Sequence, residues 1–401
     1  MKEINFKENR KKEIYGSAWE EVDLDVIKSN TKNVANFVHE KNSKTKVLAV
    51  VKADGYGHGA VEVARTMEDI VDYFGTATIF ESLELRKEGI NIPILNFSYI
   101  PQKFLEQAVK NNITITTYDY EYAKLIEFYG EKNGVLPKIH IKVDTGMSRL
   151  GYLPTDEAAN EIEKICSLKL NVEGIFSHFA KADSPEKEAT KMQAKRFFDF
   201  IKELEFRKLN FEIKHICNSA AMMEFPEYYL DMVRAGGILY GHFCLGHYVE
   251  KSPIEVQRAL SIRTILSSKK TVDANTGVSY GWLYTTERES IIGAIPIGYV
   301  DGISRKNTNN AEFLINGKRV KEVGLMCMDQ MMIDITEIDD AKIEDVVTII
   351  GRDGEEEITL EERAKAGATG KCELFAAIGN RLPKVYFKNG EYYKTLNNLL
   401  D

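Results

Sequence analysis

The chain has 401 residues, a formal net charge of -8 at pH 7 and 44% hydrophobic residues. This length predicts two domains, or one large barrel with an appendage, and either can bury a substantial core. Neither half carries a sustained basic block, which argues against binding to nucleic acid or to an anionic membrane surface. We therefore expect the partners to be small molecules.

The cysteines and the amino-terminal segment indicate the compartment. The five cysteines are widely spaced and include no Cys-x-x-Cys pair, which argues against a disulfide framework or a zinc site, and we expect no bound metal. Residues 1–12 are charged and lack the apolar segment of a secretory signal, and no apolar run is long enough to span a bilayer. These features predict a cytoplasmic protein.

Apolar, strand-like runs alternate with charged helical patterns over residues 47–237. The eight runs are residues 47–51, 73–77, 93–97, 113–117, 138–143, 172–179, 212–218 and 231–237. The intervals between them leave room for a crossover helix after each strand, as right-handed βαβ units require. Eight such units predict the fold class α/β, with a (β/α)8 TIM barrel.

The pattern changes after about residue 251. Short alternating segments separated by Gly, Asp and Asn turns predict a mostly β C-terminal domain. These segments are residues 259–266, 290–297, 312–315, 331–335 and 345–351. We expect a barrel domain over residues 25–250 and a β domain over 251–401, which the early strand 17–24 joins.

Lys52 directly follows the first barrel run and precedes the glycine-rich turn Ala53-Asp54-Gly55-Tyr56-Gly57-His58-Gly59. An ammonium group at the end of a strand buried on both faces is costly to desolvate, and a lowered pKa or a covalent imine relieves that cost. For a lone lysine the simpler interpretation is a side chain that reaches solvent. Arg149, Ser219 and Arg234 also lie at strand ends or on the last strand, where barrel active sites are found.

Eight motifs occur in a fixed order along the chain. They are Trp19-Glu20-Glu21-Val22-Asp23-Leu24, the Lys52 motif, Val143-Asp144-Thr145-Gly146-Met147-Ser148-Arg149-Leu150-Gly151, Ser177-His178-Phe179-Ala180, His215-Ile216-Cys217-Asn218-Ser219-Ala220, Val233-Arg234-Ala235-Gly236-Gly237, Val278-Ser279-Tyr280-Gly281 and Cys327-Met328-Asp329-Gln330. Together they resemble the alanine racemase family from about Ala18 to about Tyr386. The resemblance implies a pyridoxal phosphate-dependent amino-acid racemase that acts as a homodimer with shared active sites.

The resemblance also implies a role for individual residues. Lys52 would hold pyridoxal phosphate as a Schiff base and act as one catalytic base, and Tyr280 of the partner subunit would act as the opposing base. His178 would adjust the proton affinity of Tyr280. Arg234 would face the pyridine nitrogen and, because an arginine keeps its proton, would leave that nitrogen unprotonated.

The other implied residues surround the cofactor, the substrate and the entrance. The cofactor-binding residues are Lys52, Tyr56, Arg149, His178, Asn218, Ser219, Arg234, Gly236 and Gly237. The substrate-binding residues are Arg149, Met328 and Cys372, with Lys142 and Asp329 in support and Asp183, Tyr299 and Arg305 at the entrance. Lys142 matches a position that is carbamylated in some members, which would compensate the positive charge near Arg149.

Three positions depart from the pattern of the family. Cys372 stands where a tyrosine is usual, Gly237 replaces a usual isoleucine, and Leu325 replaces a frequent arginine. The missing phenol leaves room beside the substrate side chain, so alanine is the leading substrate while serine, lysine, ornithine or a broad specificity remains open.

Two alternative functions would require different features in this sequence. A decarboxylase of the ornithine decarboxylase type would have an acidic residue in place of Arg234. A non-enzymatic pyridoxal phosphate carrier would lack the β domain that contains Tyr280 and Met328.

Overall fold

The structure is a computed structural model that describes residues 13–243 and 252–400. Two compact units are defined by their internal contacts: Val26–Arg258, and Met1–Asp25 together with Ala259–Asp401. Residues 1–12, where no secretory signal is expected, and Cys244 lie outside the described residues. Within the two described ranges, no helix is both long and apolar enough to cross a bilayer, and no cluster of His, Cys, Asp or Glu side chains could hold a metal ion.

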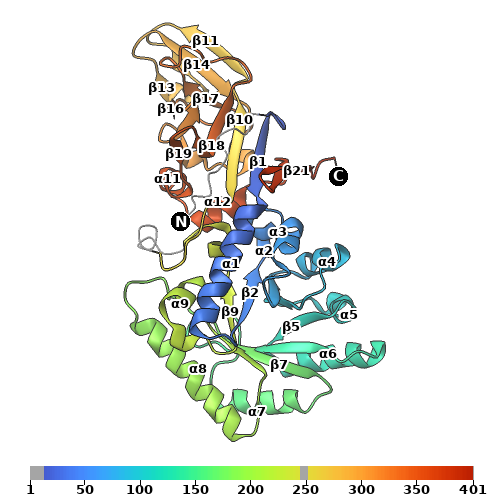
Figure 1. Cartoon of the computed structure of the whole chain (residues 1–401). Coiled ribbons are helices and arrows are strands. Elements are labelled where there is room, and N and C mark those ends of the chain that lie inside the picture. Colours follow the sequence, from blue (N-terminus) through green and yellow to red (C-terminus); the bar gives the residue numbers. More distant parts are fainter. Residues whose placement is uncertain (1–12, 244–251, 401) are drawn as a thin grey trace. The chain divides into compact units, whose positions relative to one another are not determined.

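The unit Val26–Arg258 is built around eight parallel strands (Figure 1). They are β2 (Lys46–Val50), β3 (Tyr73–Thr76), β4 (Ile94–Asn96), β5 (Ile113–Thr117), β6 (Lys138–Lys142), β7 (Asn171–Phe176), β8 (Ile213–His215) and β9 (Met232–Ala235). The strand order is β8-β7-β6-β5-β4-β3-β2-β9. Backbone hydrogen bonds from Asp231 N to Lys214 O (3.0 Å) and from Arg234 N to Cys217 O (3.1 Å) connect the two end strands. The expected (β/α)8 barrel is therefore confirmed.

Helices follow the barrel strands in turn. They are α1 (Leu24–Lys41) before β2, then α2 (Lys52–Tyr56), α3 (Ala60–Met67), α4 (Ile79–Lys87), α5 (Gln102–Lys110), α6 (Tyr120–Asn133), α7 (Asp156–Cys166), α8 (Glu188–Phe206) and α9 (Ser219–Glu224), with short 3-10 turns at Pro226–Tyr228 and Gly237–Tyr240. Thr78, Asp119 and Thr155 cap α4, α6 and α7 by accepting a backbone N–H three residues further on, at 3.3, 2.7 and 3.3 Å. These caps define where the helices begin, because the first N–H groups of a helix have no partner within it.

Three strands, β7, β8 and β9, end two or three residues earlier than the sequence predicted. The seventh run was expected to extend to residue 218, but β8 ends at His215. The sixth run was expected to extend to residue 179, but β7 ends at Phe176, so His178 lies in the loop beyond it. The neighbouring β8 already ends at His215, which pairs with Phe176, so the ladder between the two strands cannot extend further. The last run was expected to extend to residue 237, but β9 ends at Ala235, and Gly236 and Gly237 follow it.

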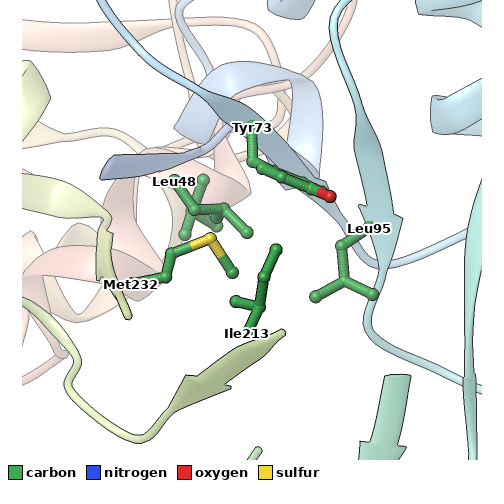
Figure 2. Close-up of a cluster of buried hydrophobic side chains, with 6 residues drawn as sticks. Leu48, Tyr73, Leu95, Ile213 and Met232 are labelled. Carbon is green, nitrogen blue, oxygen red and sulfur yellow. The ribbon is translucent and has the colours of Figure 1, made fainter. Parts of the chain in front are cut away.

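An apolar layer fills part of the barrel (Figure 2). It contains Leu48, Tyr73, Leu95, Ile213 and Met232, which come from five different strands and are all buried. Side chains from β2, β4 and β8 can meet in this way only if the strands surround them. Removing such a side chain from water stabilises the fold by about 1.5–3 kcal/mol, so this layer helps to fix the positions of the strand ends.

The second unit contains an eleven-stranded sheet. Its strands are β1 (Ala18–Asp23), β10 (Leu260–Ile265), β11 (Ser268–Val272), β14 (Ser290–Ile295), β15 (Glu312–Ile315), β16 (Lys318–Glu322), β17 (Met331–Asp334), β18 (Val346–Asp353), β19 (Glu356–Ile358), β20 (Lys384–Lys388) and β21 (Glu391–Leu396). The early strand β1 pairs antiparallel with β10 and parallel with β20.

Smaller elements complete this unit. They are the hairpin of β12 (Gly277–Val278) and β13 (Tyr284–Thr285), the helices α11 (Leu360–Ala366) and α12 (Lys371–Ala377), and 3-10 turns at Tyr280–Trp282, Tyr299–Asp301 and Arg305–Asn307. The expected mostly β C-terminal domain is confirmed.

Candidate active site

Lys52 begins an unusual turn at the carboxyl end of β2. The next residues, Ala53, Asp54 and Gly55, have φ values of 52°, 53° and 61°, so the chain makes a left-handed turn. This conformation costs roughly 1–2 kcal/mol for each residue that has a Cβ atom. The Asp54 carboxylate accepts the N–H of Ala60 at 2.8 Å, which ties the turn to the start of α3. Lys52 is thereby held at the strand end.

The same turn brings Tyr56 close to the end of β9. A methyl group added to Gly236 would lie 3.1 Å from the Tyr56 hydroxyl and 3.8 Å from Ser219 Oγ. The Gly236 N–H donates to Ser219 Oγ at 2.9 Å. Two hydroxyls and backbone N–H groups around a position without a side chain are a donor set that suits a phosphate group.

The neighbours of this position have structural roles as well. Asn218 caps α9, because its Oδ1 accepts the N–H of Ala221 at 3.0 Å. Gly237 begins the 3-10 turn that follows β9. The four residues expected near a phosphate after the last two strands therefore lie together in the barrel unit, with the side chain of Asn218 directed to the helix start.

Arg234 is buried on β9 and donates several hydrogen bonds. Its Nη1 lies 2.7 Å from His215 Nδ1 and its Nη2 lies 2.9 Å from His178 Nδ1. Nη2 also donates to the carbonyl oxygens of Ser177 and Ile216, at 2.8 and 3.0 Å. Burial lowers the pKa of Arg234 to about 10, so the group stays charged at neutral pH. A guanidinium can only donate, so each of these histidine Nδ1 atoms must be an acceptor.

His178 is consequently a neutral ring with its proton on Nε2. Burial lowers its pKa well below the ordinary value, and the positive charges of Arg234 and Arg149 lower it further. Lys142 and Lys52 contribute in the same direction. The barrel thus gathers four basic side chains around one uncharged imidazole.

Asp144 organises the loop that carries Arg149. Its carboxylate accepts the N–H groups of Gly146, Met147, Ser148 and Arg149 at 2.9, 2.9, 3.0 and 3.0 Å. Burial alone would raise the pKa of Asp144, but these four hydrogen bonds outweigh it and lower the pKa below its ordinary value. Arg149 is therefore placed by a backbone that the Asp144 carboxylate holds in one conformation.

Lys142 is buried at the end of β6. Its Nζ donates to the carbonyl oxygen of Val143 at 2.6 Å and lies 5.4 Å from the ring centre of Phe176. Burial, and then the charge of Arg234, lower the pKa of Lys142 to about 7. A large fraction of this amine is uncharged at neutral pH.

In the second unit, the segments of Tyr280 and Met328 are tied together. Ser279 has a φ of 62° and donates from Oγ to the carbonyl oxygen of Leu325 at 2.6 Å. The Val300 N–H donates to the carbonyl oxygen of Met328 at 3.2 Å. The side chains of Tyr280 and Met328 are 69% and 51% exposed. This unit therefore presents both residues on its surface.

The other expected residues of this unit lie near the same segments. Asp329 forms an ion pair with Arg381 at 2.6 Å. Tyr299 and Arg305 line a pocket of about 480 Å³, and the Arg305 guanidinium lies 5.7 Å from the centre of the Tyr299 ring. Cys372 is exposed on α12 beside Glu373 and Leu374, which line this pocket. Asp183 is exposed in the barrel unit, in the loop after β7.

Three buried residues behind Arg234 were not expected from the sequence as parts of a site. They are His140, Glu173 and His215. One signal was available, because Lys138, His140 and Lys142 alternate along β6 and so share one face of the strand. Polar side chains at alternate positions of a barrel strand deserve a functional interpretation.

The Asp144→Asn variant tests the loop of Arg149. Because the folded pKa of Asp144 is lowered, its carboxylate contributes stability that is present above the unfolded pKa and is lost as the pH falls through the folded pKa. We expect the variant to be less stable by about 1–3 kcal/mol at neutral pH, and the difference to shrink in acid. Urea unfolding of both proteins across this pH range measures it. A difference that does not depend on pH would contradict the interpretation.

Comparison with known proteins identifies two matching domain families. The model for the N-terminal domain of alanine racemase matches residues 22–243, and the model for the C-terminal domain matches residues 259–386. An alanine racemase of Methanococcus maripaludis is 44% identical over 370 residues, which are 92% of this chain and 98% of that protein. An alanine racemase of Clostridium perfringens is 40% identical over 381 residues, covering 94% and 97% of the two chains.

Solved structures agree with these matches. Alanine racemase of Clostridium difficile 630 has a TM-score of 0.92 and 38% identity, over 96% of this chain and 100% of that one. Alanine racemase of Bacillus anthracis, solved with bound L-Ala-P, has a TM-score of 0.90 and 31% identity, over 97% and 99%. Two domain models, the relatives and the fold thus lead to one conclusion, that this chain belongs to the alanine racemase family.

Proposed function

We propose that this protein is a cytoplasmic, pyridoxal phosphate-dependent racemase that interconverts L- and D-alanine as a homodimer. The observation that carries the proposal is the arrangement at the strand ends of the barrel. There, Lys52 follows β2, two hydroxyls face the side-chain-free position of Gly236, and the Arg234 guanidinium is held by four acceptors. The names of the relatives support the same reaction.

The residues present fit the cofactor. Tyr56, Ser219 and the N–H groups after β9 would hold its phosphate, because this position offers donors and no side chain obstructs it. Lys52 would bind it covalently, and Arg149 would contact its phenolic oxygen. When bound, the cofactor supplies an electron-withdrawing ring that makes the α hydrogen of the amino acid more acidic.

Arg234 would donate a hydrogen bond to the ring nitrogen. It cannot give up its proton at ordinary pH, so the nitrogen would remain an acceptor and withdraw fewer electrons than a protonated one. Restrained electron withdrawal favours return of the proton to the α carbon over side reactions. A carboxylate at this position, as expected of the decarboxylase alternative, would have the opposite effect.

Inversion at the α carbon needs a base on each face. We assign one face to the Lys52 amine and the other to the phenol oxygen of Tyr280 of the partner subunit: one group removes the proton and the other donates one. Because Arg234 fixes the proton of His178 on Nε2, that N–H would donate to the tyrosine oxygen and stabilise its phenolate form. The exposed side chains of Tyr280 and Trp282, at 69% and 74%, support an interface with a second copy.

The substrate carboxylate would be held by Arg149 and by the backbone N–H of Met328, with Asp329 supporting that segment through Arg381. Lys142 would be carbamylated, since an amine with a pKa of about 7 has an uncharged form that can bond to carbon dioxide with release of a proton. The resulting negative charge would offset that of Arg149. Asp183, Tyr299 and Arg305 would line the entrance.

Purified enzyme tests the function directly. With pyridoxal phosphate bound, we expect L-alanine to lose its optical activity faster than the other L-amino acids of a panel, and the Lys52→Ala variant to be inactive. Borohydride reduction followed by peptide mapping should find the pyridoxyl group on Lys52. An adduct on another lysine, or no change in the rotation of any amino acid, would contradict the assignment.

The shared site predicts complementation between two inactive variants. Lys52→Ala and Tyr280→Phe proteins should each be nearly inactive, yet mixing them should restore about a quarter of the wild-type activity, because half of the re-associated dimers are mixed and each has one intact site. Capture through a tag on one variant checks that subunits exchange. No recovery despite exchange would place both bases in one chain.

Cys372 provides a test of substrate preference. Cys372→Tyr should raise the selectivity for alanine over serine and larger amino acids by about 1–3 kcal/mol, which is what one pocket contact can supply. Cys372→Ser is the matched control, since it changes the chemistry but not the size and should leave the ratio unchanged. Values of kcat/KM for both substrates measure the effect. An unchanged ratio in Cys372→Tyr would mean that other residues shape the pocket.

A further inference from the structure

A chain of hydrogen bonds runs from Arg234 through the interior of the barrel. Arg234 Nη1 lies 2.7 Å from His215 Nδ1, and His215 Nε2 lies 3.0 Å from His140 Nδ1. His140 Nε2 in turn lies 3.2 Å from Glu173 Oε2. These residues come from β9, β8, β6 and β7, and all four are buried.

The chemistry of the two ends gives the chain one direction. Arg234 can only donate, so His215 accepts at Nδ1 and carries its proton on Nε2. That proton is donated to His140 Nδ1, which leaves the proton of His140 on Nε2, facing the carboxylate. The reverse order would place an N–H of His215 against an N–H of Arg234. Both imidazoles are therefore neutral and point the same way.

Glu173 is a stable acceptor at the far end. Tyr73 donates its hydroxyl to Oε2 at 2.5 Å, and Lys138 forms an ion pair with Oε1 at 2.9 Å. Burial raises the pKa of Glu173, but the hydrogen bonds from His140, Tyr73 and Lys138 outweigh it and lower the pKa to about 2. The chain thus connects a buried cation to a buried anion.

Arg234 needs this distant charge. Within the described residues it forms no ion pair, and the acceptors of its hydrogen bonds are two carbonyl oxygens and two neutral histidines. A buried charge without compensation costs several kcal/mol. Two imidazole dipoles aligned between Arg234 and Glu173 provide the compensation without bringing a carboxylate to the strand end.

The packing holds both rings in place. The His215 ring stacks on Phe176, with 4.7 Å between ring centres and an angle of 5° between the planes. A methyl group added to Gly174 would lie 2.6 Å from His140 Cε1, so the glycine makes room for that ring. The geometry of the chain is thus specified by the surrounding barrel.

We propose that His215, His140 and Glu173 are positioning residues, which keep the Arg234 guanidinium charged and in one orientation at the mouth of the barrel. The inference rests on the proposed function in one respect, namely that Arg234 faces the bound cofactor. The hydrogen-bond chain itself can be tested without cofactor or substrate.

The first experiment is nitrogen NMR of apo enzyme labelled with ¹⁵N-histidine. The chain contains 7 histidines, and the spectra of His140→Asn and His215→Asn identify the two resonance sets. We expect both rings to be neutral, with the proton on Nε2 and a bare Nδ1. A proton on Nδ1 of either ring, or a doubly protonated ring, would overturn the proposal.

The second experiment removes the charge and keeps the shape. In apo Glu173→Gln, we expect the ring resonances of both His140 and His215 to shift. Lys138→Gln is the matched control, because it removes another partner of the same carboxylate but leaves its charge, and should shift His215 much less. A change confined to His140 would show that the charge is not transmitted to Arg234, and would overturn the proposal.

The third experiment measures racemisation by the loaded enzyme. We expect Glu173→Gln to lower kcat about tenfold with KM for alanine within about twofold of wild type, since an interaction needed only in the transition state has been weakened. Lys138→Gln should keep kcat within about twofold. An unchanged kcat in Glu173→Gln would overturn the proposal. If the wild-type enzyme racemises no amino acid, the proposed function is wrong. The NMR experiments would still test the hydrogen-bond chain from Arg234 to Glu173.

Discussion

The burial of one guanidinium group governs the arrangement of this barrel. Arg234 is removed from water, keeps its charge and can only donate hydrogen bonds. Every neighbour must therefore be an acceptor, which explains why His178 and His215 both turn Nδ1 toward it and why two backbone carbonyls complete its contacts. A lysine at this position would supply the charge but has only three N–H donors for these four acceptors.

The same constraint decides which chemistry the site can support. A carboxylate in contact with Arg234 would neutralise it most directly, but such a group could also stabilise a protonated nitrogen of a ligand at the strand end. Glu173 instead acts across two imidazoles. The end of β9 therefore has a hydrogen-bond donor that does not release its proton. Return of a proton to the α carbon of an amino acid, without side reactions, requires such a donor.

Much of the fold could be predicted because it depends on local patterns. The barrel strands are buried on both faces, so each appears as an apolar run, and the eight predicted runs coincide with β2 to β9 to within a few residues. The limits of β7 could not be predicted, because they depend on where the neighbouring β8 ends. Exposed strands such as β11, which contains Lys269 and Lys270, have no apolar signature at all.

Two hairpins of the second unit could have been found. Asn316-Gly317 joins β15 to β16, and Asn389-Gly390 joins β20 to β21. All four residues have positive φ, between 50° and 75°, which is the conformation that a two-residue turn needs and that Asn-Gly adopts readily.

The hydrogen-bond chain from Arg234 to Glu173 was harder to foresee. A histidine on a strand usually has a purely structural partner, and only the assembled barrel brings β6, β7 and β8 to the same interior.

The carboxylates and the basic side chains of this barrel have different kinds of partner. The pKa of His178 is lowered by the charges of four basic side chains, Lys52, Lys142, Arg149 and Arg234. The nearby carboxylate of Asp144, in contrast, accepts four backbone N–H groups. Glu173 is likewise committed to His140, Tyr73 and Lys138. The negative charges thus stabilise the fold while remaining bound to their own donors, and Lys52 and Arg149 are the basic side chains proposed to contact the ligand. A ligand with a phosphate at one end and a carboxylate at the other matches that field at both ends.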